Sequence, residues 1–232
     1  GLIHAADYLQ DSLPGSLQLD QQDLPDRILG IVPKSQVWRA LKLLNNPLGM
    51  RAVNAAKALA AAKLEHGKSY RQTLVEFSYL LDYVPNWRNA YLPHGFLQYQ
   101  PFVPREVAPR VFEHLNRLQR ERGIVAFLGV LKCHRPDRFP LSWALDGYSL
   151  AMDFKIPAAG RAALADLCDA MTEVVLDAGG RFYWAKDSLL RPADVERYLG
   201  DALTCFRQVK AQFDPQTLLS SSLARRFGLF ER

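Results

Sequence analysis

The chain has 232 residues, of which 49% are hydrophobic and 23% are charged, a balance typical of soluble globular proteins. Its net charge of +5 is compatible with an anionic ligand, a membrane surface or nucleic acid, and does not choose among them. No run of about 18 apolar residues predicts a transmembrane helix. The three cysteines lack C-x-x-C spacing, so neither a disulfide framework nor a zinc site is indicated.

The first third of the sequence predicts a mainly helical extension, residues 1–75. Proline and glycine punctuate residues 1–33, which favours loops and short turns. Residues 35–67 have helical spacing of apolar side chains, and Asn45-Asn46-Pro47 should break them into two helices. The polar side of this stretch is basic, so it could lie on an anionic membrane, although packing on its own domain is the commoner arrangement. Residues 73–89 are interpreted as a connection.

From Gly95 onward, six segments follow the order β-α-β-β-α-β. The expected strands are residues 96–103, 124–133, 148–156 and 181–185, and the expected helices are 105–122 and 161–177. This order predicts an α+β fold with a ferredoxin-like core, which we place in a domain of residues 76–190. In that arrangement the first and third strands are neighbours in the centre of an antiparallel sheet, and both helices cover one face.

Alternation along the two central strands sorts polar from apolar side chains. Leu97 and Tyr99 should face the helices, together with the row Leu150, Met152 and Phe154. The opposite face should then carry a polar floor, made of Gln98, Gln100, Ser149 and Asp153. Such a floor is a candidate binding surface.

The stretch Gly179-Gly-Arg-Phe-Tyr-Trp-Ala-Lys-Asp-Ser188 is the most distinctive in the chain. Gly179-Gly180 can supply the turn after a helix, because glycine tolerates a positive φ. The aromatic strand that follows should deliver Lys186 to its end. Burial there would lower the pKa of the lysine and allow it to accept a proton, whereas a solvated strand-end lysine would have no such role.

Several common motifs are absent from the sequence. It has no G-x-G-x-x-G, P-loop, H-E-x-x-H or G-x-S-x-G pattern. The five histidines lack ligand-like spacing, so no metal site is expected. Neither central strand carries the basic-Gly-aromatic signature of RNA-binding sheets, and we expect no nucleic-acid partner.

Residues 77–230 resemble the substrate-binding (cap) region and C-terminal tail of FAD-linked oxidases of the vanillyl-alcohol oxidase type. The matching pieces run in order over about two thirds of the chain: Gly95-Phe-Leu-Gln-Tyr-Gln100, Phe127-Leu-Gly-Val-Leu-Lys132, Pro140-Leu-Ser142, Asp153-Phe154, Gly179–Ser188, Asp214-Pro215 and Ala224-Arg-Arg226.

This resemblance implies that a separate domain holds most of the FAD, and that the cap sheet covers the flavin and binds an alcohol or sugar. The chain would then be a fragment of a longer protein. Residues 191–232, with helices near 192–199 and 202–213 and a basic tail, would pack on the cap or on that FAD domain. In cells we expect a cytoplasmic or membrane-peripheral protein.

The resemblance also implies roles for individual residues. Lys186 resembles the family's active-site lysine, which lies near the flavin and the reacting hydroxyl, and Gln100 would also touch the cofactor. The substrate pocket would be lined by Gln98, Gln100, Lys132, Tyr183 and Ser149. Strict alternation places Lys186 and Tyr183 on opposite faces, so a bend after Trp184 would be needed.

Three positions depart from the family pattern and leave the substrate open. A pocket cysteine of the family falls at Ala151, a neighbouring asparagine at Ser149, and an aromatic residue at Ser78. A different polar alcohol is compatible with these changes. A non-catalytic module that binds a ligand or a protein remains the alternative.

Overall fold

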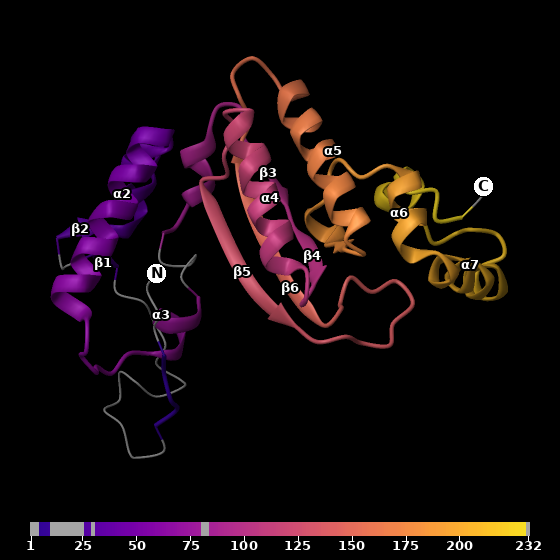
Figure 1. Cartoon of the computed structure of the whole chain (residues 1–232), viewed down its shortest axis with the longest axis horizontal. Coiled ribbons are helices and arrows are strands. Elements are labelled where there is room, and N and C mark those ends of the chain that lie inside the picture. The colour runs from indigo at the N-terminus through magenta and orange to yellow at the C-terminus, as the bar shows by residue number, and fades with distance from the viewer. Residues whose placement is uncertain (1–4, 10–25, 29–30, 80–83, 231–232) are drawn as a thin grey trace. The chain divides into compact units, whose positions relative to one another are not determined.

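The computed structural model describes residues 5–9, 26–28, 31–79 and 84–230 (Figure 1). The chain divides into two compact units, Gly1–Gly95 and Phe96–Arg232. Part of the expectation for residues 1–33 lies outside the described residues. Within the described ranges, no helix is both long and apolar enough to cross a membrane.

The first unit is mainly helical. Asn46 separates its two principal helices, because its side chain accepts a hydrogen bond from Gly49 N–H at 2.9 Å and caps the second. This confirms the predicted break. The elements are β1 (Arg27–Ile28), β2 (Val32–Pro33), η2 (Lys34–Gln36), α1 (Val37–Leu44), α2 (Pro47–Ala60), η3 (Ala61–Glu65), α3 (Leu74–Ser78) and η4 (Trp87–Tyr91).

Two expectations for this unit are corrected. Residues 73–89 were interpreted as a connection, yet they contain α3 and η4; Thr73 and Glu76 form a capping box that starts α3. The apolar side of α2 was expected to pack on its own domain. It buries only Gly49, and Leu48 and Leu59 are exposed.

The second unit is a five-stranded antiparallel sheet with helices α4 and α5 on one face (Figure 1). Three further helices follow in the C-terminal region. The elements are β3 (Phe96–Tyr99), β4 (Pro101–Pro104), α4 (Ala108–Glu121), β5 (Leu128–His134), β6 (Gly147–Lys155), α5 (Ala162–Asp177), β7 (Arg181–Phe182), η5 (Trp184–Lys186), α6 (Pro192–Leu199), α7 (Asp201–Phe213) and α8 (Ser222–Arg226).

Strand β6 organises the sheet. It pairs along one edge with β5, and along the other with β3 and then β4; β7 pairs with the far edge of β4. One register runs through β3 and β4, from Phe96 opposite Lys155 to Phe102 opposite Ser149. The first and third predicted strands are therefore neighbours, as expected, and the first is interrupted only at Gln100.

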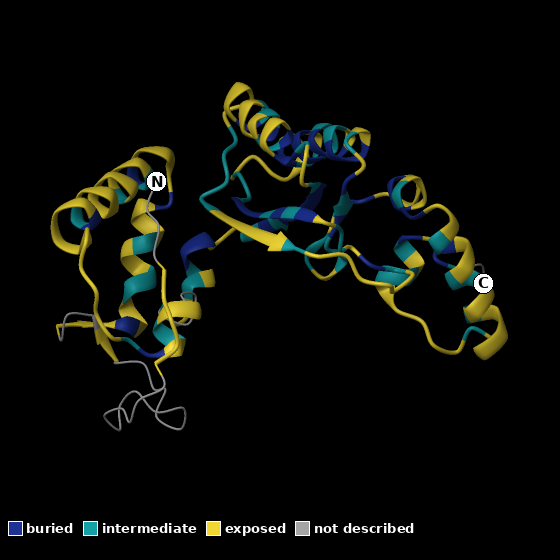
Figure 2. Cartoon of the chain, turned by 60° about the horizontal axis from the view of Figure 1, so that its bottom comes forward, coloured by how far each residue is buried: buried dark blue, intermediate teal, exposed yellow. Residues whose placement is uncertain are grey.

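The helix-covered face of the sheet is apolar. Leu97 and Tyr99 of β3 and Met152 and Phe154 of β6 are buried in one hydrophobic core with the inner side of α5. Figure 2 shows the middle strands in dark blue and β5 mostly exposed. The predicted alternation is confirmed on this face, because directly opposed residues of an antiparallel pair point to the same side.

The glycine pair after α5 has the predicted role. Gly179 has a φ of +72°, which a residue with a side chain rarely adopts. At Gly180, a Cβ would lie 2.6 Å from the carbonyl oxygen of Phe102, so only glycine lets the chain approach β4 this closely.

The predicted strand 181–185 is wrong in its length. Strand β7 ends at Phe182, and Trp184–Lys186 forms a 3-10 turn instead. The backbone N–H of Lys186 donates to the carbonyl of Tyr183 at 3.2 Å and closes this turn. Lys186 thus lies in a turn and not at a strand end, and the anticipated bend begins before Trp184.

Candidate functional site

The face of the sheet opposite α4 and α5, which we call the polar face, carries Gln98 and Asp153 side by side. They are directly opposed on β3 and β6, and Gln98 Nε2 donates to Asp153 Oδ1 at 2.7 Å. Asp153 is 2% exposed, and its Oδ2 is buried without a hydrogen-bond partner among the described residues. Burial raises the pKa of this carboxyl, and the Gln98 bond and the charge of Lys186 oppose the rise.

A second polar group links three strands of the same face. Gln100 Nε2 donates to Ser149 Oγ at 3.1 Å, and Ser149 Oγ lies 2.8 Å from His134 Nε2. Ser149 is completely buried, and Gln100 Oε1 is a buried acceptor with no partner in the described structure. Unpaired buried polar atoms are uncommon in folded proteins and call for an explanation such as a missing ligand.

Lys186 is brought to the polar face by the turn after β7. The backbone N–H of Tyr183 donates to the carbonyl of Gln100 at 3.1 Å, which anchors the start of the turn to β3 and β4. Burial lowers the pKa of Lys186, and the positive charge of Lys132 lowers it further, whereas Asp153 raises it. Desolvation of the lysine, predicted from the sequence, is confirmed.

Asp187 fixes the backbone on the other side of Lys186. Its Oδ1 accepts from the backbone N–H groups of Leu189 and Leu190, both at 3.2 Å. Its Oδ2 forms an ion pair of 2.6 Å with Arg226 of α8. Arg226 also donates to the carbonyls of Asp187 and Leu190, so the C-terminal tail is tied to the lysine turn.

The loop between β5 and β6 borders the polar face near β7. Arg181 donates to the carbonyls of Ser142 and Ala144 at 3.1 and 3.0 Å. The rings of Trp143 and Tyr183 meet edge to face, with centroids 4.8 Å apart. Tyr183 therefore has an apolar neighbour at the rim.

The structure brings the predicted site residues onto one side of the sheet. Gln98, Gln100 and Ser149 lie on its central strands, Lys132 is directly opposite Ser149 on exposed β5, and Tyr183 and Lys186 follow β7. The polar floor was expected to be an open binding surface, and this is corrected: Gln100, Ser149 and Asp153 are each at most 6% exposed.

Two residues of this arrangement were not among the predicted site residues. Alternation placed Asp153 on the floor and assigned it no further role, although it borders Gln98 and acts on Lys186. His134 was considered only among the five histidines, whose spacing predicts no metal site. Its position two residues after Lys132 on the same strand was the signal that places it on this face.

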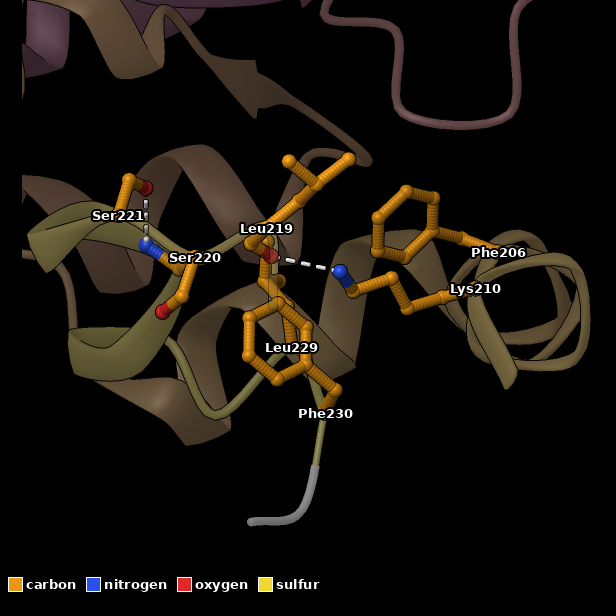
Figure 3. A pocket seen from close by; sticks show the side chains of 8 residues that line it. Phe206, Lys210, Leu219, Ser220, Ser221, Leu229 and Phe230 are labelled. Atoms are coloured by element: carbon orange, nitrogen blue, oxygen red, sulfur yellow. Dashed lines mark hydrogen bonds between the residues drawn. The ribbon is translucent and has the colours of Figure 1, made fainter. Parts of the chain in front are cut away.

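A separate hollow of about 370 Å³ lies between α7 and the C-terminal tail (Figure 3). Phe206, Leu219 and Phe230 line it, and Lys210 donates there to the carbonyl of Leu219 at 2.6 Å and pairs with Asp214. Its walls are mostly apolar and it shares no residue with the polar face. In the described part of the chain, no group of three or more His, Cys, Asp or Glu residues could hold a metal.

Comparison with known proteins assigns the chain to a family. Residues 96–227, more than half of the chain, match the family D-arabinono-1,4-lactone oxidase. The chain belongs to this family. Its members are FAD-linked oxidases, which confirms the resemblance drawn from the sequence and indicates FAD as the cofactor.

Two relatives extend this result. Over 159 residues, 68% of this chain, it is 33% identical to decaprenylphosphoryl-β-D-ribose oxidase of Mycolicibacterium smegmatis. Over 125 residues, 51% of the chain, it is 35% identical to a Streptomyces coelicolor protein described as an uncharacterized protein in the mprA 5' region. The aligned segments span only 33% and 32% of the length of these relatives.

Proposed function

We propose that the polar face forms the substrate side of the active site in a longer FAD-linked oxidase that oxidises the hydroxyl of an alcohol or sugar. A separate domain of that protein would hold most of the FAD. The observation that carries the proposal is the position of Lys186, a partly buried lysine with a lowered pKa, beside buried acceptors that have no partner in the part of the chain that the structure describes.

The residues of the polar face fit a flavin and a hydroxylated substrate. A flavin ring edge carries both N–H donors and carbonyl acceptors, and a sugar carries hydroxyls. Gln100 Oε1 and Asp153 Oδ2 are acceptors in need of a donor, and Lys186 supplies donors. Lys186 and Gln100 would contact the cofactor; the substrate would be held by Gln98, Gln100, Lys132, Ser149 and Tyr183.

In this mechanism Lys186 is the proton acceptor. Its neutral amine takes the proton from the hydroxyl of the substrate. As the C–H bond of the same carbon breaks and releases a hydride, the C–O single bond becomes a carbonyl double bond. When bound, a flavin would supply the redox chemistry as the hydride acceptor. The lowered pKa matters because only the unprotonated amine can act as a base, and burial enlarges that fraction at neutral pH.

The decisive experiment is Lys186→Ala in the full-length protein. Loss of a general base should reduce turnover by about 10²–10⁴-fold, with the flavin spectrum retained. Ser188→Ala, an exposed position two residues after Lys186, is the matched control and should keep turnover near that of the wild type. Unchanged turnover in Lys186→Ala would exclude the role, and a full-length product purified without flavin would favour a non-catalytic module.

The pH profile gives a sharper test, because the neighbours of Lys186 act in opposite directions. Activity should rise with pH as Lys186 loses its proton. Since Lys132 lowers the pKa of Lys186 and Asp153 raises it, Lys132→Met should move this limb to higher pH, and Asp153→Asn should move it to lower pH. Equal limbs in all three proteins would show that another group controls the rate.

A further inference from the structure

Three buried or half-buried polar side chains form a chain across the sheet: His134 on β5, Ser149 on β6, and Gln100 between β3 and β4. The distances are 2.8 Å from His134 Nε2 to Ser149 Oγ and 3.1 Å from Gln100 Nε2 to Ser149 Oγ. The ring of His134 packs against Phe102, with centroids 4.6 Å apart. We call these three residues the relay.

A serine hydroxyl has one proton to donate and two lone pairs that can accept. Ser149 Oγ accepts from the Gln100 amide, and in the arrangement proposed below it donates its proton to His134 Nε2. Burial and the charge of Lys132 lower the pKa of His134, which favours the neutral ring that this direction requires, with its proton on Nδ1.

A proton on Nε2 would reverse the relay. His134 would donate to Ser149 Oγ, and the serine proton would then need another acceptor. Gln100 Oε1 can take this proton if the amide turns over, exchanging Oε1 with Nε2. Gln100 Oε1 has no partner among the described residues, so this reversal would replace an available acceptor on the polar face with an available donor.

We propose that His134 is a positioning residue: through Ser149 it holds the Gln100 amide so that Oε1 is presented to the bound molecule, where it accepts a hydroxyl or N–H hydrogen bond. That the bound molecule is a flavin or its substrate rests on the proposed function. The hydrogen bonds among His134, Ser149 and Gln100 do not depend on the proposed function.

The surroundings of His134 favour its neutral form. On its own strand, Lys132 is the nearest charge, and burial together with Lys132 lowers the pKa of the imidazole. Phe102 and Ser149, which touch the ring from β4 and β6, are uncharged. Arg181 on β7 is directly opposite Phe102, and its guanidinium donates to the carbonyls of Ser142 and Ala144. No carboxylate takes part in the relay, so a proton on the imidazole has no counter-ion within it.

Nuclear magnetic resonance of the 232-residue chain tests the relay without any flavin. At neutral pH, the nitrogen shifts of His134 should report a neutral ring with the proton on Nδ1. As the pH falls, the side-chain amide protons of Gln100 should shift with the same midpoint as His134. The amide of Gln98, which donates to Asp153, is the internal control and should not follow that midpoint.

Two variants isolate the connection. Ser149→Ala should leave His134 titrating while the Gln100 amide no longer responds. Should that variant not fold, His134→Phe keeps an aromatic ring against Phe102 and removes the titrating nitrogen, and the Gln100 amide should again become independent of pH. A His134 ring with its proton on Nε2, or a Gln100 amide that ignores the His134 midpoint in the wild type, would overturn the proposal.

The two proposals can fail separately. If turnover in the full-length protein does not depend on Lys186 but the relay behaves as described, the proposed function fails and the ordering of Gln100 stands. If turnover depends on Lys186 and the Gln100 amide ignores His134, only the relay is wrong.

Discussion

The two faces of the sheet in the second unit are built on different principles. On the helix-covered face, Phe154 and its neighbours on β3 and β6 pack against α5 and are almost entirely buried. On the polar face, hydrogen bonds join the side chains, and Gln100 and Asp153 each keep a buried oxygen with no partner among the described residues. The helix-covered face is held mainly by apolar packing, whereas the polar face has buried acceptors that lack hydrogen-bond donors. Under the proposed function, a bound molecule would supply these donors.

Removing apolar volume from the helix-covered face should have the largest effect on stability. Phe154 is 0% exposed, and Phe154→Ala should lower the free energy of unfolding by about 3–5 kcal/mol, because transfer energy is lost and a cavity remains. Val130, on the polar face of exposed β5, is 37% exposed. Val130→Ala should therefore lower the free energy of unfolding by less than about 1 kcal/mol. Urea titration of both variants measures the two losses. Equal losses would remove the contrast between the faces.

Breaking the ion pair between Asp187 and Arg226 should have the second largest effect on stability. Arg226→Gln leaves the Asp187 carboxylate, whose side chain is 9% exposed, without its charged partner, and should cost about 1–3 kcal/mol. Hydrogen exchange should accelerate at Leu189 and Leu190, whose N–H groups depend on Asp187. Arg225 bonds only to exposed serines among the described contacts, and Arg225→Gln is the matched control. Faster exchange in both variants would point to general loosening of the tail.

The smallest effect is expected at Asp153. Burial raises the pKa of this carboxyl in the folded state above its value in the unfolded state. Between these two pKa values the folded protein binds more protons than the unfolded chain. The free energy of unfolding therefore falls as the pH rises through this window. Asp153→Asn lacks this loss and should be more stable than the wild type above the window. The gain should stay below about 1 kcal/mol, because Asn can still accept from Gln98 and leaves an unpaired amide instead.

Unfolding at several pH values checks this sign. The difference between Asp153→Asn and the wild type should shrink toward acid pH, where the wild-type carboxyl is protonated in both states. A variant that is less stable at neutral pH would mean that attraction between Asp153 and Lys186 outweighs the burial of the carboxylate.

The sequence predicted most of the second unit because its signals are local. Period-two alternation identified the sheet faces, and Pro192 marks the first residue of α6 as predicted. The ends of elements were less accurate: the helix expected from residue 105 begins at Ala108, and α8 lies in a segment interpreted as a tail. Such ends depend on capping contacts that a periodic pattern does not contain.

What the sequence determined by itself was which side chains can share a face, since alternation follows from backbone geometry alone. It also indicated that Gly179-Gly180 can supply the turn after α5 and that Lys186 follows the aromatic segment after that turn. Only the tertiary structure decided the register that places His134 beside Ser149, the ion pair from Arg226 to the lysine turn, and the burial of the polar face. Each of these joins residues distant in sequence, and their energies depend on desolvation, which exists only once the chain is folded.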